Sequence, residues 1–208
     1  MSNATDENVA TPDGAARPGS AAVRAGHVPG EEGIWVLIGG DLVVFSLFFA
    51  TFLFYRGEDP GTFRSAQLRL DQGFGVLNTL LMLTSSWFVA TAVRAARRGL
   101  RDPAGLALLL AMACGLGFLA SKFFEYREKL HAGITPATND FFMYYFVFTG
   151  IHGVHVLAGM GVLLFVARQV ASRPLEGRTL RNIESGASFW HLVDLLWIVL
   201  FALLYLLR

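Results

Sequence analysis

FFMYYFVFTGIHGVHVLAG, residues 141–159, is the stretch that decides the fold class. It is almost wholly apolar, and the apolar run continues to residue 167, which exceeds the about 20 residues that a helix needs to cross about 30 Å of hydrocarbon. Two histidines, His152 and His155, nevertheless lie inside it. At membrane depth an imidazole either takes part in chemistry or holds neighbouring helices together.

The rest of the chain is equally apolar. Of its 208 residues, 54% are hydrophobic and 16% are charged, which is too much apolar surface for one soluble core. Strands are excluded, because the long runs are too uniformly apolar for a barrel and an open sheet would leave backbone groups unpaired in lipid. The sequence predicts an all-α, polytopic membrane helical bundle over residues 33–208. Its five transmembrane helices are expected at residues 33–55, 74–93, 104–126, 141–167 and 186–207.

The first 32 residues differ from the rest. They are rich in Ala, Gly, Ser and Pro and lack apolar periodicity, so residues 1–32 are predicted to form a flexible tail. Ten arginines fall on the side of the amino terminus, against five arginines and one lysine on the other side. The positive-inside rule then predicts a cytoplasmic amino terminus and a carboxyl terminus outside. A net charge of +1 gives no case for nucleic acid as a partner.

Ionisable side chains within or beside the apolar runs are the candidate site residues, because a charge in lipid is costly and usually faces a partner inside the bundle. The spacing of three places both histidines of the opening stretch on one helix face. Steps of seven and three likewise place three residues of the last helix on one stripe. The full set is Asp41, Glu125, His152, His155, Glu184, His191 and Asp194.

Depth in the membrane follows from the helical rise of about 1.5 Å per residue. Asp41 and Asp194 each lie about 12 Å from the cytoplasmic start of their helices, whereas Glu125 lies near the outer end of its helix. His155 and His191 also fall in the cytoplasmic half of the membrane. We therefore expect an inner cluster of Asp41, His155, His191 and Asp194, with Glu184 at its rim.

Three interpretations of these histidines are open from spacing alone. A haem would need imidazoles at similar depth on facing helices, which depth permits for His155 with His191 and which would leave His152 spare. Alternatively, the imidazoles hydrogen-bond neighbouring carboxylates and lock the helices together, which satisfies groups that lipid cannot. The third interpretation is a proton path.

Small and amide residues favour the packing interpretation. Gly150, Gly153 and Gly159 give the fourth predicted helix small faces that allow close approach of a neighbour. Asn78 in the second predicted helix offers interhelical hydrogen bonds.

Four motifs taken together resemble one family, subunit III of the haem-copper respiratory oxidases. Residues 149–159, TGIHGVHVLAG, resemble its penultimate helix, and the pattern E-x6-H-x2-D, here Glu184, His191 and Asp194, resembles its last. VLNTLLMLTSS (76–86) is similar to an internal segment of the family, and FFEY (123–126) to a motif near a helix end. Along the chain the four motifs follow the order of the family, and together they cover essentially residues 33–207.

The chain also departs from the family pattern. The mitochondrial form has seven spanning helices, and this chain matches the last five, a short form found among bacterial members. Asp41 stands where cytochrome oxidase members usually carry a membrane glutamate. That substitution, with PGEEGIW (29–35) before it, resembles the NorE-type branch associated with nitric oxide reduction.

The resemblance implies a non-catalytic accessory subunit of a respiratory oxidase in the bacterial inner membrane. Haem and copper would belong to the catalytic partner subunit, while this chain would carry no cofactor beyond bound phospholipid. The histidines would be structural partners of carboxylates, and Asp41 would support proton uptake by the complex. A stand-alone transporter or proton channel is the rival, although five helices do not divide into the two equal repeats that transporters commonly show.

Overall fold

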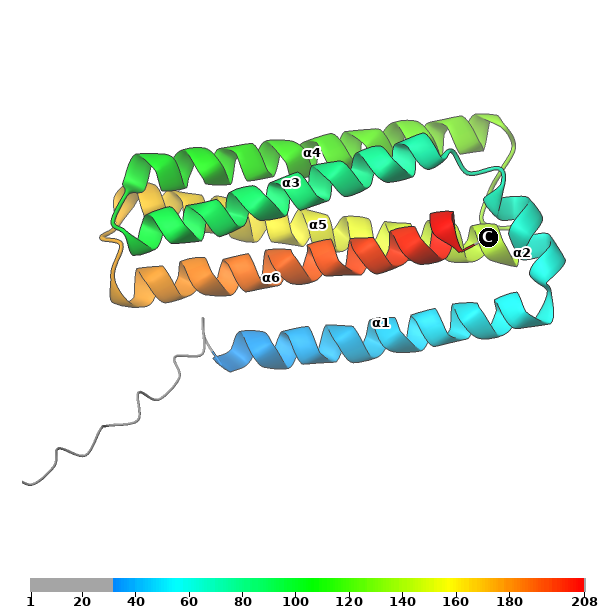
Figure 1. Cartoon of the computed structure of the whole chain (residues 1–208), viewed down its shortest axis with the longest axis horizontal. Helices are drawn as coiled ribbons and strands as arrows, with labels where there is room; N and C mark the ends of the chain where they lie inside the picture. The colour runs from blue at the N-terminus through cyan, green and yellow to red at the C-terminus, as the bar shows by residue number, and fades with distance from the viewer. Residues whose placement is uncertain (1–31, 208) are drawn as a thin grey trace, which may run out of the picture.

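The structure is a computed structural model that describes residues 32–207 (Figure 1). The part of the chain that it describes is all-helical, and five of its helices are long and apolar enough to cross a membrane, as predicted. The tail expected at residues 1–32 lies outside the described residues except for its last position. The helices are α1 (Glu32–Glu58), α2 (Pro60–Gln67), α3 (Gln72–Arg97), α4 (Arg101–His131), α5 (Asp140–Ser172) and α6 (Gly177–Phe201), followed by a π-helical turn, η1 (Ala202–Leu206).

Every spanning helix is longer than its apolar run. The runs mark only the hydrocarbon-facing part, whereas helices continue through polar residues into the headgroup region until a cap ends them. Asp71 caps α3 by accepting a hydrogen bond from the Gly73 N–H, and Asn139 caps α5 through the Phe142 N–H. α6 begins nine residues earlier than its predicted start, at Gly177 rather than 186.

α2 was not predicted, because eight residues without an apolar run give no membrane signal. Proline begins this helix, and the Asp59 side chain caps it by accepting a hydrogen bond from the Thr62 N–H at 3.1 Å. Its buried face presents Phe63, Ala66 and Gln67 to the bundle. The helix therefore covers one end of the bundle and joins α1 to α3.

Four helices form the body of the molecule (Figure 1). α3 packs against α4 and α6, and α5 packs against the same two helices, so α3 to α6 close into an antiparallel ring. α1 lies beside this ring rather than within it. Only 11% of the most apolar window of α1 is buried, against 50% for α6. The interior that could hold a functional site is therefore enclosed by α3, α4, α5 and α6.

α1 is fastened to α5 by a stripe of phenylalanines. Phe45 and Phe52 are buried, and the Phe52 ring lies 5.4 Å from the Phe63 ring and 6.1 Å from the Phe148 ring. Most other large side chains of α1 are exposed, as expected for a helix that faces lipid or a partner. The aromatic stripe thus holds an otherwise weakly packed helix in place.

Candidate functional site: polar groups inside the bundle

Asp41 of α1 and His155 of α5 form an ion pair between the two helices. His155 Nε2 lies 3.3 Å from Asp41 Oδ2, and both side chains are largely buried. The other ring nitrogen, Nδ1, lies 2.9 Å from the Ile151 carbonyl oxygen, which can only accept, so Nδ1 carries a hydrogen. One further proton must then lie between Nε2 and Oδ2 if they attract each other.

His191 of α6 faces α3 rather than α5. Its Nδ1 lies 2.6 Å from the Ser86 hydroxyl oxygen. Asp194, three residues along the same stripe, interacts with both Ser86 and His191. One serine hydroxyl on α3 thus joins an imidazole and a carboxyl on α6.

Glu184 lies at the arginine-rich end of the same stripe. Its side chain is 4% exposed and its Oε1 lies 2.9 Å from the Arg97 guanidinium. This charge pair also joins α3 to α6. Glu184 and Arg97 therefore mark the end of the polar stripe near the membrane surface.

The inner cluster expected from depth is divided in two. Asp41 and His155 meet between α1 and α5, whereas His191 and Asp194 meet Ser86 between α3 and α6. Within residues 32–207 no hydrogen bond or ion pair joins the two groups. The expectation of one cluster differs from the structure because equal depth says nothing of the direction in which each helix turns its stripe.

His152 also differs from expectation, because no carboxylate of the described residues contacts it. It is fully buried, and its ring lies 5.4 Å from the Phe118 ring and 5.3 Å from the Trp197 ring. Phe118 and Trp197 in turn meet edge to face at 4.7 Å. Neither ring nitrogen of His152 has a hydrogen-bond partner among the described residues. These three rings form an aromatic layer across the middle of the bundle.

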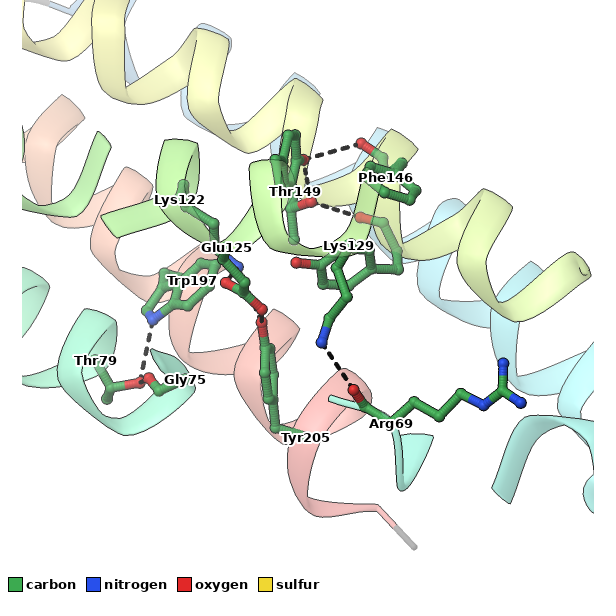
Figure 2. A network of polar contacts seen from close by, with 12 residues as sticks. Arg69, Gly75, Thr79, Lys122, Glu125, Lys129, Phe146, Thr149, Trp197 and Tyr205 are labelled. Atoms are coloured by element: carbon green, nitrogen blue, oxygen red, sulfur yellow. Dashed lines mark hydrogen bonds and ion pairs between the residues drawn. The ribbon is translucent and has the colours of Figure 1, made fainter. Parts of the chain in front are cut away.

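Glu125 belongs to a second polar network, toward the other end of the bundle (Figure 2). Lys122 Nζ donates to Glu125 Oε2 at 2.7 Å and to the Tyr205 hydroxyl at 2.9 Å. Tyr205 donates to Glu125 Oε1 at 2.6 Å. A lysine, a carboxylate and a phenol therefore satisfy one another where α4 meets the end of the chain.

Aromatic rings surround the Lys122 ammonium on its remaining sides. It lies 4.8 Å from the Trp197 ring centroid and 5.3 Å from that of Tyr145, distances at which a cation is attracted to the ring face. Lys122 is not among the predicted site residues, although a lysine three residues before Glu125 inside an apolar run is a usable signal.

Further hydrogen bonds tie α2 and the neighbouring loop to the same region. Lys129 Nζ donates to the Arg69 carbonyl at 2.8 Å, and Gln67 Nε2 donates to the Leu203 carbonyl at 3.0 Å (Figure 2 shows the former). Trp197 Nε1 donates to the Thr79 hydroxyl at 3.1 Å. Side chains that reach backbone carbonyls and one hydroxyl thus hold this end of the bundle.

The family assignment rests on a match along the whole helical region. The family profile described as "Cytochrome c oxidase subunit III" matches residues 33–208. The chain belongs to this family. The quinol oxidase subunit 3 of Bacillus subtilis (strain 168) is 29% identical over 174 residues, covering 84% of this chain and 85% of that protein.

Two other relatives also match most of the chain. The cytochrome c oxidase subunit 3 of Synechocystis sp. is 31% identical over 194 residues, which are 91% of this chain and 81% of that protein. The heme-copper oxidase subunit I+III of Aeropyrum pernix is 28% identical over 181 residues, which are 83% of this chain but 22% of that longer protein. None of the three is named as a nitric oxide reductase subunit, so the NorE-type branch has no support among them.

Subunit III of this family lacks the redox centres, which belong to subunit I. The haem interpretation also conflicts with the geometry, because His155 faces Asp41 of α1 with both ring nitrogens engaged, whereas His191 faces Ser86 of α3. Within the described residues no group of three His, Cys, Asp or Glu side chains could hold a metal ion.

The candidate packing residues behave unequally. A Cβ on Gly159 would lie 2.8 Å from the Trp190 ring, whereas one on Gly153 would meet nothing within 4 Å and one on Gly150 only the Tyr126 hydroxyl at 4.0 Å. Asn78 is fully buried, yet neither of its amide atoms has a hydrogen-bond partner among residues 32–207. Close approach therefore concerns Gly159, and not the other two glycines.

Proposed function

We propose that this chain is the non-catalytic accessory subunit III of an oxygen-reducing haem-copper oxidase. The observation that carries this proposal is the family match over residues 33–208, which leaves none of the spanning helices outside it. The named relatives are subunits of quinol and cytochrome c oxidases, which favours an oxidase over a nitric oxide reductase. The chain would add stability and proton supply to a complex whose chemistry takes place elsewhere.

The partner would be the catalytic subunit I. In the relative from Aeropyrum pernix, subunits I and III are named as one protein, so the two parts are covalently joined there. A separate subunit III would make the same association through its surface. The weakly packed α1 and the many exposed apolar side chains leave ample surface for such a contact.

Bound phospholipid fits a pocket beside α1. The pocket has a volume of about 330 Å³, is almost wholly apolar, and lies between α1, α5 and α6. Its walls include Leu37 of α1, Val162 of α5 and Phe189 of α6. An acyl chain would fill this space, and the first two helices of the seven-helix form would not be needed to hold it.

The orientation proposed here places the arginine-rich ends of α3, α5 and α6 in the cytoplasm. Asp41 and His155 then lie in the cytoplasmic half of the bilayer, where an oxidase takes up protons. The pair would support proton uptake by the neighbouring catalytic subunit. It would not conduct electrons.

Purification from the native membrane tests the partner. The chain would carry its tag at the amino end, because Tyr205 near the other end is hydrogen-bonded inside the bundle. Extraction in mild detergent, followed by mass spectrometry, should recover a haem-copper catalytic subunit in near-equal amount. Recovery of this chain alone, from membranes whose oxidase stays intact through the same extraction, would contradict the proposal and favour a transporter.

A further inference from the structure

A groove runs between α3 and α6 at the arginine-rich end of the bundle. It has a volume of about 270 Å³, and both polar and apolar atoms line it. The α3–α6 groove is lined by Ala90, Val93, Arg94, Arg97, Glu184, Ala187, Ser188 and His191. The Asp41–His155 pair is not part of this groove.

The lining of the groove is too charged for contact with lipid chains. Arg97 and Glu184 form their ion pair across it, and Arg94 Nε donates to the Ala90 carbonyl at 3.3 Å. A second guanidinium, that of Arg94, therefore lines the groove in addition to the paired one. Charged groups at this depth need water or a polar partner around them.

The groove ends at a chain of three polar side chains. His191 lines the groove and its Nδ1 lies 2.6 Å from the Ser86 hydroxyl oxygen, which also interacts with Asp194. Asp194 is 7% exposed, and its Oδ1 is buried without a hydrogen-bond partner among residues 32–207. Asp194 thus offers an unpartnered carboxyl oxygen on the same helix face as His191, which lines the groove.

We infer that the α3–α6 groove is a water-filled proton inlet that delivers protons from the arginine-rich side to Asp194. A proton from groove water binds Nε2, the outward nitrogen of neutral His191. The hydrogen on Nδ1 then passes to the Ser86 oxygen. The hydroxyl hydrogen of Ser86 passes to the Asp194 carboxylate. The net result is one proton moved from water to Asp194, with His191 and Ser86 neutral again. A half-turn of the His191 ring and a rotation of the Ser86 hydroxyl reset the chain. No bond other than these N–H and O–H bonds changes.

The inlet does not continue across the membrane. Trp197 lies one turn beyond Asp194 on α6, and with Phe118 and His152 it forms the aromatic layer. The Lys122 and Glu125 network lies beyond that layer. Within residues 32–207 no hydrogen bond links Asp194 to that network, so a proton on Asp194 would leave by the inlet or sideways to a neighbouring subunit. This inference therefore rests on the proposed accessory function.

Water in the groove can be tested with the full chain in lipid vesicles. In a Cys114→Ala background, Ser188→Cys is exposed to an anionic, membrane-impermeant methanethiosulfonate from the arginine-rich side. The matched control is Leu157→Cys, which is more than half exposed on α5, outside the groove, and near the level of the groove because Gly159 meets Trp190. Since the reagent attacks the thiolate, which hydrocarbon disfavours, we expect Ser188→Cys to react on the order of tenfold faster.

Two results would overturn the groove as an inlet, and a second variant guards against a folding defect. Equal rates for Ser188→Cys and the Leu157→Cys control would show a dry groove. So would the absence of reaction at Val93→Cys, which places the thiol on the facing wall. Because these rates are measured without any partner, a failure here differs from a failure to recover the catalytic subunit.

Proton delivery is tested in the assembled oxidase. Asp194→Asn should slow proton uptake during turnover, with the difference growing as pH rises and free protons become scarce, while the haem spectrum is unchanged. Glu128→Gln, on the exposed face of α4 and on the other side of the aromatic layer, is the control and should leave the pH profile of uptake unchanged. An unaltered pH profile in Asp194→Asn would refute the inlet, because a purely structural role predicts no dependence on proton supply.

Discussion

Trp190 of α6 lies against the bare backbone of Gly159 of α5, so closely that a Cβ there would be 2.8 Å from the indole ring. Gly115 of α4 accepts the same indole from the other side, where a Cβ would lie 3.0 Å away. Two glycines on two helices thus form the seat of one tryptophan, and together they set how closely α4, α5 and α6 approach.

The first prediction concerns this seat. Gly159→Ala should destabilise the bundle by about 1–3 kcal/mol, because a fully buried indole has no room to move aside. The measurement is the midpoint of thermal unfolding in detergent. Gly153→Ala is the matched control, since its Cβ meets nothing, and it should be neutral or slightly stabilising. Equal loss in both variants would mean that helix flexibility, and not the indole, explains the glycines.

The second prediction concerns Lys122 and Glu125. Lys122→Met leaves the Glu125 carboxylate buried without its cation, so we expect a loss of about 3–5 kcal/mol. The double variant Lys122→Met/Glu125→Gln should recover part of that loss, because neither charge remains. Glu128→Gln on the exposed face of the same helix serves as control. Additive losses in the double variant would show that the two side chains do not depend on each other.

The third prediction tests the stripe that holds α1. Phe52→Ala removes a fully buried aromatic side chain that contacts α2 and α5. The free energy of unfolding should therefore fall by about 3–5 kcal/mol. We also expect α1 to separate from the four helices α3 to α6. Proteolysis of the segment joining α1 to α2 is the direct measurement, with faster cleavage expected. Leu53→Ala, on the exposed face of α1, should change neither quantity.

The fourth prediction concerns the Asp41–His155 pair. Asp41→Ala should lower the turnover of the assembled oxidase and leave its haem spectrum unchanged, because the pair lies in a subunit without redox centres. Asp41→Glu keeps the carboxyl group and should retain more turnover than Asp41→Ala. A lost haem spectrum in the alanine variant would instead indicate that Asp41 acts in assembly.

The five spanning helices were predictable because length and apolarity are properties of a single segment. The partners of the polar side chains were not, because spacing along a helix gives depth and face but not the direction in which that face points. His155 and His191 have similar depth, yet one faces α1 and the other α3. If the order of α3 to α6 around the ring were known, the two histidines could be assigned to different neighbouring helices.

Other features left weaker signals. α2 is too short and too polar to stand out, and its role becomes visible only once Phe63 is seen against Phe52. Lys122 was readable as a charge inside an apolar run, but its partners Tyr205 and Trp197 lie some 80 residues away in sequence. Long-range contacts of this kind follow from the helix order around the ring, which one sequence does not specify.

The position of Lys122 and Glu125 on one helix, three residues apart, has a consequence for biogenesis. Helices enter the bilayer in chain order, so α4 arrives before α6 and before the Tyr205 hydroxyl that later completes the network. An ammonium entering alone would favour rejection of the segment by the insertion machinery. Because the Glu125 carboxylate lies on the same turn of helix, α4 can be inserted as a nearly neutral segment before Tyr205 is present.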